Sequence, residues 1–131
     1  MKDCNTYPPN NSTVAPLISW IANWHYDRNL IDGATDKDQF AKLIQEAGEL
    51  SDNICKGENV VDDIGDMIVV LINIAERNNL TIEECLLHAW NDIKDRKGKM
   101  VDGVFVKEEA PKLRNVAAGP VRVYPNTDCF E

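Results

Sequence analysis

The amino-acid sequence predicts an all-α fold, a four-helix-bundle-like arrangement that carries a small C-terminal β-hairpin and an extended tail. Apolar residues recur at helical spacing in four segments, capping and turn residues separate these segments, and an Asp102-Gly103 pair lies between two short β-type runs. A chain of 131 residues is most simply one domain. We expect a core at about residues 14–107, a loose lead-in at 1–12 and an extended tail at 108–131.

The four predicted helices span about residues 13–25, 36–56, 60–77 and 82–94. The second is the clearest amphipathic helix, with its acidic residues on the polar flank. The third is apolar almost all round, and it exceeds the usual strand length of about 5–6 residues, which favours a central buried helix. The capping candidates are Ser12 or Thr13, Thr35 or Asp36, and Thr81, which forms a capping-box pattern with Glu84.

Composition excludes several classes of partner. Acidic residues exceed basic residues by 22 to 14, so the chain repels nucleic acids, and no apolar run is long enough to span a membrane. The four cysteines form no CxxC pair, which argues against zinc, and no secretory signal is apparent, so we expect a cytoplasmic protein with free thiols. The excess of acidic residues suits binding of divalent cations, but an acidic surface exposed to solvent gives the same net charge. The positions of the acidic residues in the sequence must therefore distinguish the two.

Two acidic pairs occupy informative positions. Glu46 and Glu49 lie three residues apart on the second predicted helix, and Asp63 and Asp66 lie three apart at the start of the third. If these helices are antiparallel neighbours, the four carboxylates converge near the short connection. Four clustered carboxylates repel one another unless a cation neutralises them, and hard oxygen ligands select Mg²⁺ or Mn²⁺. The alternative is a solvated helix face and a pair of aspartates that complement a helix dipole.

The segments Lys42–Leu50 and Asp62–Asp66, with the apolar helix that follows, resemble the MazG-like all-α nucleoside triphosphate pyrophosphohydrolase superfamily. That superfamily pairs an E-x-x-E helix with a following E/D-x-x-D helix, and the resemblance extends from about Trp24 to Lys107. It implies a MazG-type fold and Mg²⁺-dependent cleavage of a (deoxy)nucleoside triphosphate, in which water attacks the α-phosphorus and releases a monophosphate and pyrophosphate. By position it implies that the catalytic, metal-binding residues are Glu46, Glu49, Asp63 and Asp66.

Other parts of the chain match the superfamily less closely. Gln45 stands where a second glutamate is frequent, and an amide cannot serve as a carboxylate ligand or base. The end of the fourth helix resembles a segment that meets the triphosphate, which supplies most of the candidate substrate-binding residues: Lys42, Asn91, Lys94, Arg96, Lys97 and Trp24. Tryptophans on amphipathic faces are more often core residues than base-stacking residues, and His25 and His88 are expected to be incidental.

Two interpretations of function therefore stand. The first is a pyrophosphohydrolase acting on nucleoside triphosphates. The second is a catalytically silent helical oligomer that binds nucleotide or a protein partner, which Gln45 keeps open. In either case the apolar circumference of the third helix needs more cover than three other helices supply, so we expect a homodimer or homotetramer.

Overall fold

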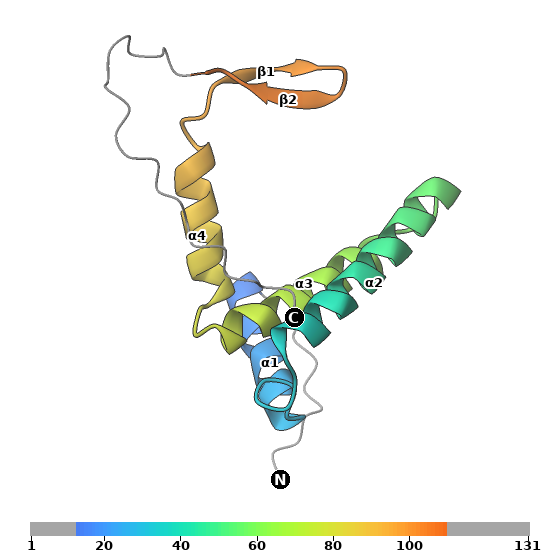
Figure 1. Ribbon diagram of the computed structural model, residues 1–131, viewed down its shortest axis with the longest axis vertical. Helices are drawn as coiled ribbons and strands as arrows, with labels where there is room; N and C mark the ends of the chain where they lie inside the picture. Colours follow the sequence, from blue (N-terminus) through green and yellow to red (C-terminus); the bar gives the residue numbers. More distant parts are fainter. Residues whose placement is uncertain (1–12, 110–131) are drawn as a thin grey trace, which may run out of the picture. The chain divides into compact units, whose positions relative to one another are not determined.

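The computed structural model describes residues 13–109, which form four helices and one antiparallel hairpin (Figure 1). The elements in chain order are α1 (Val14–Asp27), α2 (Asp36–Lys56), α3 (Val61–Arg77), α4 (Ile82–Ile93), β1 (Gly98–Val101) and β2 (Val104–Lys107). The predicted mostly helical fold with a small hairpin is confirmed. The predicted lead-in at 1–12 and the tail from residue 110 onward lie outside the described residues.

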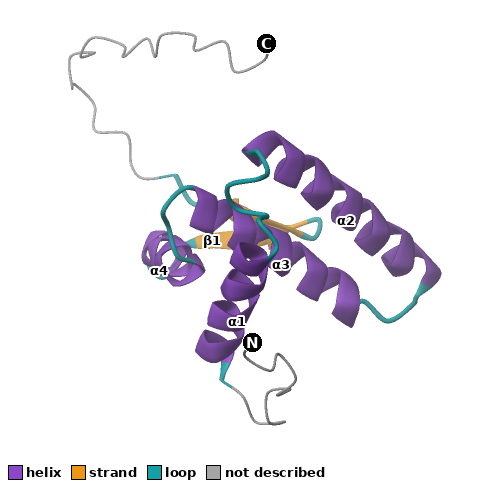
Figure 2. Cartoon of the chain, turned by 90° about the horizontal axis from the view of Figure 1, so that it is seen from below, coloured by secondary structure: helices purple, strands orange, loops and turns teal. Residues whose placement is uncertain are grey.

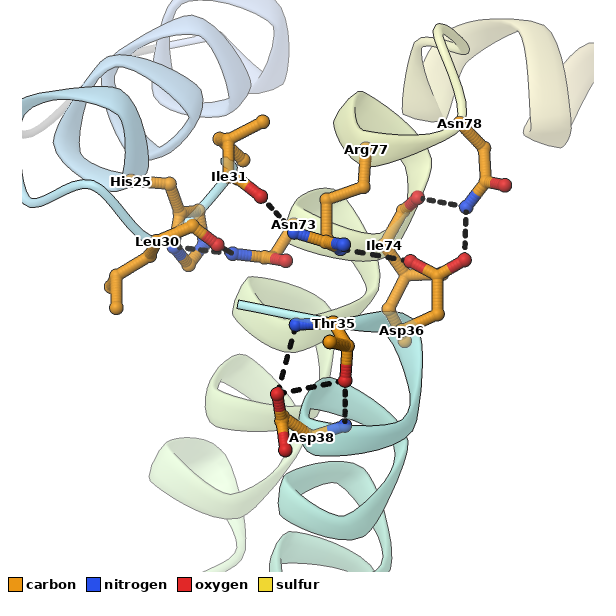
Figure 3. Close-up of polar contacts among 10 residues, drawn as sticks. All are labelled: His25, Leu30, Ile31, Thr35, Asp36, Asp38, Asn73, Ile74, Arg77 and Asn78. Carbon is orange, nitrogen blue, oxygen red and sulfur yellow. Dashed lines mark hydrogen bonds and ion pairs between the residues drawn. The ribbon is translucent and has the colours of Figure 1, made fainter. Parts of the chain in front are cut away.

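Local capping chemistry sets the ends of α2 and α4. The Thr35 side chain accepts a hydrogen bond from the backbone N–H of Asp38, whose carboxylate accepts one from the backbone N–H of Thr35 (Figure 3). Gly57 ends α2 in the left-handed region at φ 68°. The capping box predicted for α4 between Thr81 and Glu84 is present. These caps explain why both helices begin where the sequence indicates.

The chain divides into two compact units, Met1–Lys94 and Asp95–Glu131. In the first unit α3 is the central helix, because α1, α2 and α4 each pack against it. Figures 1 and 2 both show α2 running alongside α3. The core between α1 and α3 consists of Ile18, Ala22 and Ile72, with Ile21 and Ile82 packed against it. The prediction of a central third helix is therefore confirmed.

A buried polar network joins α1 to α3 next to this core (Figure 3). The Nε2 atom of His25 lies 2.9 Å from the carbonyl oxygen of Val69, which can only accept, so Nε2 carries the hydrogen. Nδ1 of the same ring then accepts from the Nδ2 of Asn73, 3.2 Å away, and Asn73 also donates to the Leu30 carbonyl oxygen at 3.0 Å. The expectation that His25 is incidental is wrong, because it is a buried structural residue.

Side chains from the end of α3 hold the start of α2 (Figure 3). The Nε atom of Arg77 donates to the Asp36 carboxylate at 2.8 Å, and its guanidinium also donates to the Ile31 carbonyl oxygen. Asn78 donates to the second carboxylate oxygen of Asp36. The hydrogen bonds from Arg77 and then Asn78 lower the pKa of Asp36. These contacts place the N-terminus of α2 beside the C-terminus of α3, as an antiparallel pair requires.

Burial along α2 differs from the pattern that the sequence predicts. Glu46 is the buried residue of this helix, whereas Phe40, Ile44 and Ile54 on the predicted apolar stripe are exposed. The tryptophans are also more exposed than predicted, because Trp20 and Trp24 are each 44% exposed and Trp90 is 58% exposed. The prediction that they are core residues is wrong within a single chain, because α1 and α4 each pack against α3 and leave these rings partly open to solvent.

The second unit contains the hairpin that the Asp102-Gly103 pair predicts. Strands β1 and β2 are antiparallel, with Val101 opposite Val104. Asp102 and Gly103 have φ angles of 48° and 80°, the positive values that a two-residue type I′ turn requires at both positions. Among residues 13–109, no helix has the length and apolar character needed to cross a membrane.

Candidate functional site

Four polar residues of α2 form a stripe on the helix side that faces α3. They occur at the spacing i, i+4, i+7 and i+11, which keeps side chains on one helical face. These residues, called the α2 polar stripe below, are Lys42, Glu46, Glu49 and Asn53. Glu46 is 5% exposed and Asn53 is half-buried, whereas Lys42 and Glu49 are exposed, so the stripe lies at the edge of the contact with α3. The connection of residues 57–60 is short, and it brings the first turns of α3 back beside this stripe.

The carboxylate of Asp63 is held by the last residue of the stripe. Asp63 lies in the first turn of α3 and is 6% exposed. The Nδ2 atom of Asn53 donates a hydrogen bond of 2.8 Å to Oδ2 of Asp63. The N-terminal end of the α3 dipole also favours a negative charge at this position. Asp63 therefore has one oxygen fixed by α2, in an orientation that the two helices determine together.

The carboxylate of Glu46 is only half satisfied. Its Oε1 atom lies 2.6 Å from Nζ of Lys42, one helical turn earlier. Its Oε2 atom is buried and has no hydrogen-bond partner. A buried carboxylate oxygen without a donor is energetically unfavourable by about 1–3 kcal/mol or more, and such atoms are uncommon in folded proteins. The orphaned oxygen marks a place where a cation or a donor from outside the chain would be stabilised.

The other two predicted ligands, Glu49 and Asp66, are exposed, yet both act on the same ammonium group. The hydrogen bond that Lys42 donates to Glu46 raises the pKa of Lys42, and the charges of Glu46, Glu49 and Asp66 raise it further against the opposing effect of burial. Of the predicted ligands, Glu46 contacts Lys42 directly, while Glu49 and Asp66 act on it through their charges. That the four carboxylates converge on one centre stays a prediction.

The side chains as they stand surround this ammonium rather than a metal-sized centre. Within residues 13–109, no three His, Cys, Asp or Glu side chains form a group that could hold a metal ion. The donor set nevertheless fits a hard cation, because it consists of carboxylate oxygens and one of them is buried and unpartnered. Rotation of the exposed Glu49 and Asp66 side chains is the change that coordination would need.

The predicted substrate-binding residues are placed less closely together. At the C-terminal end of α4, Nζ of Lys94 donates to Oδ1 of Asn91 at 3.1 Å, and both residues are exposed. Arg96 and Lys97 are exposed in the segment that precedes β1 in the second unit. Trp24 is exposed at the end of α1, where the guanidinium of Arg28 lies 4.3 Å from its ring centroid. His88 lies on the surface of α4, 3.6 Å from Asp92.

Asn53 is a site residue that the sequence motif does not include. The E-x-x-E pattern ends at Glu49, and an asparagine four residues later is unremarkable as a motif. The available signal is spacing: Asn53 follows Glu46 by seven residues and therefore shares its helical face. Only the partner helix shows that this face is opposite Asp63.

Comparison with known proteins adds little to this geometry. No protein-family model matches the chain, and no solved structure matches it. A curated relative is an uncharacterized 18.2 kDa protein in the rep-hol intergenic region of Haemophilus phage HP1 (strain HP1c1), 41% identical over 66 residues. The match covers 49% of this chain and 40% of the relative's length. That relative has no assigned activity, so the residues of the site carry the functional proposal.

The substitution Asn53→Ala tests the contact with Asp63. It removes the donor from a buried carboxylate, so we expect the metal-free protein to lose about 1–3 kcal/mol of unfolding free energy, measured by urea denaturation. Lys56→Met is the control on the same helix, since it removes the exposed ion pair of Lys56 with Asp52. That change should stay within about 0.5 kcal/mol. Equal losses in the two variants would contradict a structural role for Asn53.

Proposed function

We propose that this chain is a cytoplasmic, Mg²⁺-dependent nucleoside triphosphate pyrophosphohydrolase of the MazG type. The reaction is the hydrolysis of a (deoxy)nucleoside triphosphate to the monophosphate and pyrophosphate, with water attacking the α-phosphorus and the bond to the bridging oxygen breaking. The observation that carries the proposal is Glu46: it is the buried residue of α2, and one of its carboxylate oxygens has no partner. The E-x-x-E and D-x-x-D helices that frame it supply the remaining ligands.

Folding alone gives no reason for this arrangement. Buried charges are costly to desolvate, and apolar residues of similar volume frequently give equal or greater stability. On α2 the carboxylate of Glu46 is buried while Phe40, Ile44 and Ile54 remain exposed. Leu43, Ala47 and Leu50 of the same helix are partly buried, so Glu46 is the most buried residue on a face that also carries apolar side chains. Burial of a carboxylate on such a face supports a role in chemistry or ligand binding.

Each residue of the site has a role in the proposal. Bound Mg²⁺ would neutralise the carboxylates, hold phosphate oxygens and make a coordinated water more acidic. Glu46 and Asp63 supply ligands from fixed, buried positions, while Glu49 and Asp66 supply exposed ligands, and one of the four carboxylates accepts the proton of the attacking water. Within the first unit, the residues proposed to meet the triphosphate are Lys42, Asn91 and Lys94, and Trp24 would meet the base. Arg96 and Lys97 belong to the second unit and are phosphate-binding candidates from the sequence alone.

The position of Gln45 favours the enzyme over the catalytically silent alternative. Gln45 is exposed and lies one residue before Glu46, so its side chain is turned about 100° away from the α2 polar stripe. The neutral amide therefore replaces no member of that stripe. A glutamate at position 45 would lie beside the site and not within it. Its replacement by glutamine therefore leaves the four proposed ligands in place.

Turnover and product identity test this function. Purified protein incubated with each common ribo- and deoxyribonucleoside triphosphate should release monophosphate and pyrophosphate from at least one of them, separated by ion-exchange chromatography. Hydrolysis should require Mg²⁺ or Mn²⁺ and stop in excess chelator. Glu46→Gln, of nearly equal volume, is the matched inactive control that excludes a contaminating phosphatase. Products of diphosphate and orthophosphate, or no turnover of any nucleotide, would contradict the proposal.

The substitution Asp66→Asn separates a metal ligand from a dipole-complementing residue. Asp66 is exposed, so the metal-free variant should unfold within about 0.5 kcal/mol of wild type. Wild type should gain thermal stability on addition of Mg²⁺ through preferential binding to the native state, and Asp66→Asn should gain much less. Asp52→Asn, an exposed carboxylate outside the site, should gain as much as wild type. An equal increase in thermal stability with Mg²⁺ in all three proteins would show that Asp66 is not a metal ligand.

The proposal includes a homodimer or homotetramer. Ile64, Ile68 and Leu71 are spaced along one face of α3 and are 40–48% exposed. Together with the exposed apolar residues of α2, they leave two helices without apolar cover in a single chain. Light scattering at micromolar concentration should give two or four times the chain mass of 14.7 kDa. Ile68→Asp should lower this mass without unfolding the helices; a wild-type monomer would contradict the prediction.

A further inference from the structure

The ammonium of Lys42 occupies the position where the charges of the site converge. Its contact with Oε1 of Glu46 is 2.6 Å long, and the carboxylates of Glu49 and Asp66 also act on it. The partners differ in burial: the Lys42 side chain is 48% exposed and the Glu46 side chain is 7% exposed. The lysine can therefore move into solvent along its flexible stem, whereas Glu46 is fixed.

A second ion pair on the same helix provides a comparison. Lys56 and Asp52 are also four residues apart, with Nζ and Oδ2 separated by 2.6 Å, but their side chains are 59% and 61% exposed. Solvent can satisfy both of those groups if the pair opens. When the Lys42 pair opens, Glu46 is left as a buried, uncompensated carboxylate, because its second oxygen already lacks a partner. The two pairs share spacing and length and differ in what remains when the cation leaves.

Charge balance around Lys42 favours its replacement by a divalent ion. One ammonium contacts the carboxylate of Glu46 and is also acted on by the charges of Glu49 and Asp66, so a local excess of negative charge remains. A divalent cation would neutralise more of this charge and would accept the unpartnered Oε2 of Glu46 as a ligand. The ammonium at Oε1 would then lie only a few ångströms from a like charge, where repulsion is strong.

We propose that Lys42 is the resident counter-ion of the metal-free site, and that a divalent cation binds by displacing its ammonium from Glu46. Lys42 thus holds the carboxylates together before metal arrives and sets the metal concentration at which the site fills. This inference rests on the proposed function only in requiring that these carboxylates bind a divalent cation. It assigns Lys42 a regulatory role beyond contact with substrate phosphates.

The affinity for Mn²⁺ without nucleotide measures this competition directly. Free Mn²⁺ can be followed by electron paramagnetic resonance during titration of wild type, Lys42→Met and the control Lys56→Met. Removal of the competing charge should tighten Mn²⁺ binding by Lys42→Met roughly tenfold, as expected for a unit charge a few ångströms away in partly solvated surroundings. Lys56→Met should bind Mn²⁺ as wild type does. Lys42→Met should also be less stable than wild type without metal and should regain stability when Mn²⁺ is present.

Lys42→Gln is the second variant if Lys42→Met fails to fold, because its amide can donate to Glu46 without carrying a charge. It too should bind Mn²⁺ more tightly than wild type. Equal or weaker Mn²⁺ binding by the Lys42 variants would overturn the inference, and so would an absence of Mn²⁺ binding in every protein. Tighter binding by the variants in a protein that hydrolyses no nucleotide would support the inference and refute the proposed function. Mn²⁺ binding that is unchanged in the Lys42 variants, in a protein that does hydrolyse nucleotide, would support the proposed function and refute the inference.

Discussion

The pairing of α2 with α3 is fixed near both ends by polar side chains that cross between the two helices. Arg77 and Asn78 hold Asp36 at one end, and Asn53 holds Asp63 at the other. Such contacts set both the antiparallel direction and the axial position of the pair, which apolar packing alone specifies weakly because it is not directional. The position of every acidic residue relative to its counterpart on the other helix depends on this registration. A shift by one turn would separate Asn53 from Asp63.

The same pairing creates an electrostatic problem that the chain solves with one lysine. Two carboxylates, those of Glu46 and Asp63, are removed from water. Asp63 receives an amide donor, and Glu46 receives an ammonium, yet one oxygen of Glu46 remains without a partner. A fold that retains such a group is under local electrostatic strain, and strain of this kind concentrates where proteins bind ligands. A second such atom lies in the His25 network at the α1–α3 contact, where both ring nitrogens have hydrogen bonds but Oδ1 of Asn73 is buried without a partner.

The exposed side of α2 carries large apolar side chains. Phe40, Ile44 and Ile54 are uncovered, while Glu46 is buried beside α3 together with the partly buried Leu43 and Leu50. In the proposal, the flank with Glu46 would form the site within the chain, and the uncovered apolar flank would meet a neighbouring subunit. The third helix follows the same division, since Asp63 faces α2 while Ile64 and Ile68 are exposed. The proposed oligomer and the proposed site would therefore use different faces of the same helix pair.

Sequence by itself determined the elements and the candidate ligands, because both depend on short-range chemistry. The Thr35 and Thr81 caps, the left-handed Gly57 and the two positive φ angles of the hairpin turn arise from neighbouring residues, and they lie where the sequence indicates. Tertiary structure alone decided which residues of α2 are buried, that Asn53 meets Asp63, and that the charges of three carboxylates act on Lys42. An amphipathic pattern identifies the face that is most favourable to bury, but actual burial requires a partner element. Here α3 lies against Glu46 and Asn53, and the polar contacts at both ends of the pair fix that position.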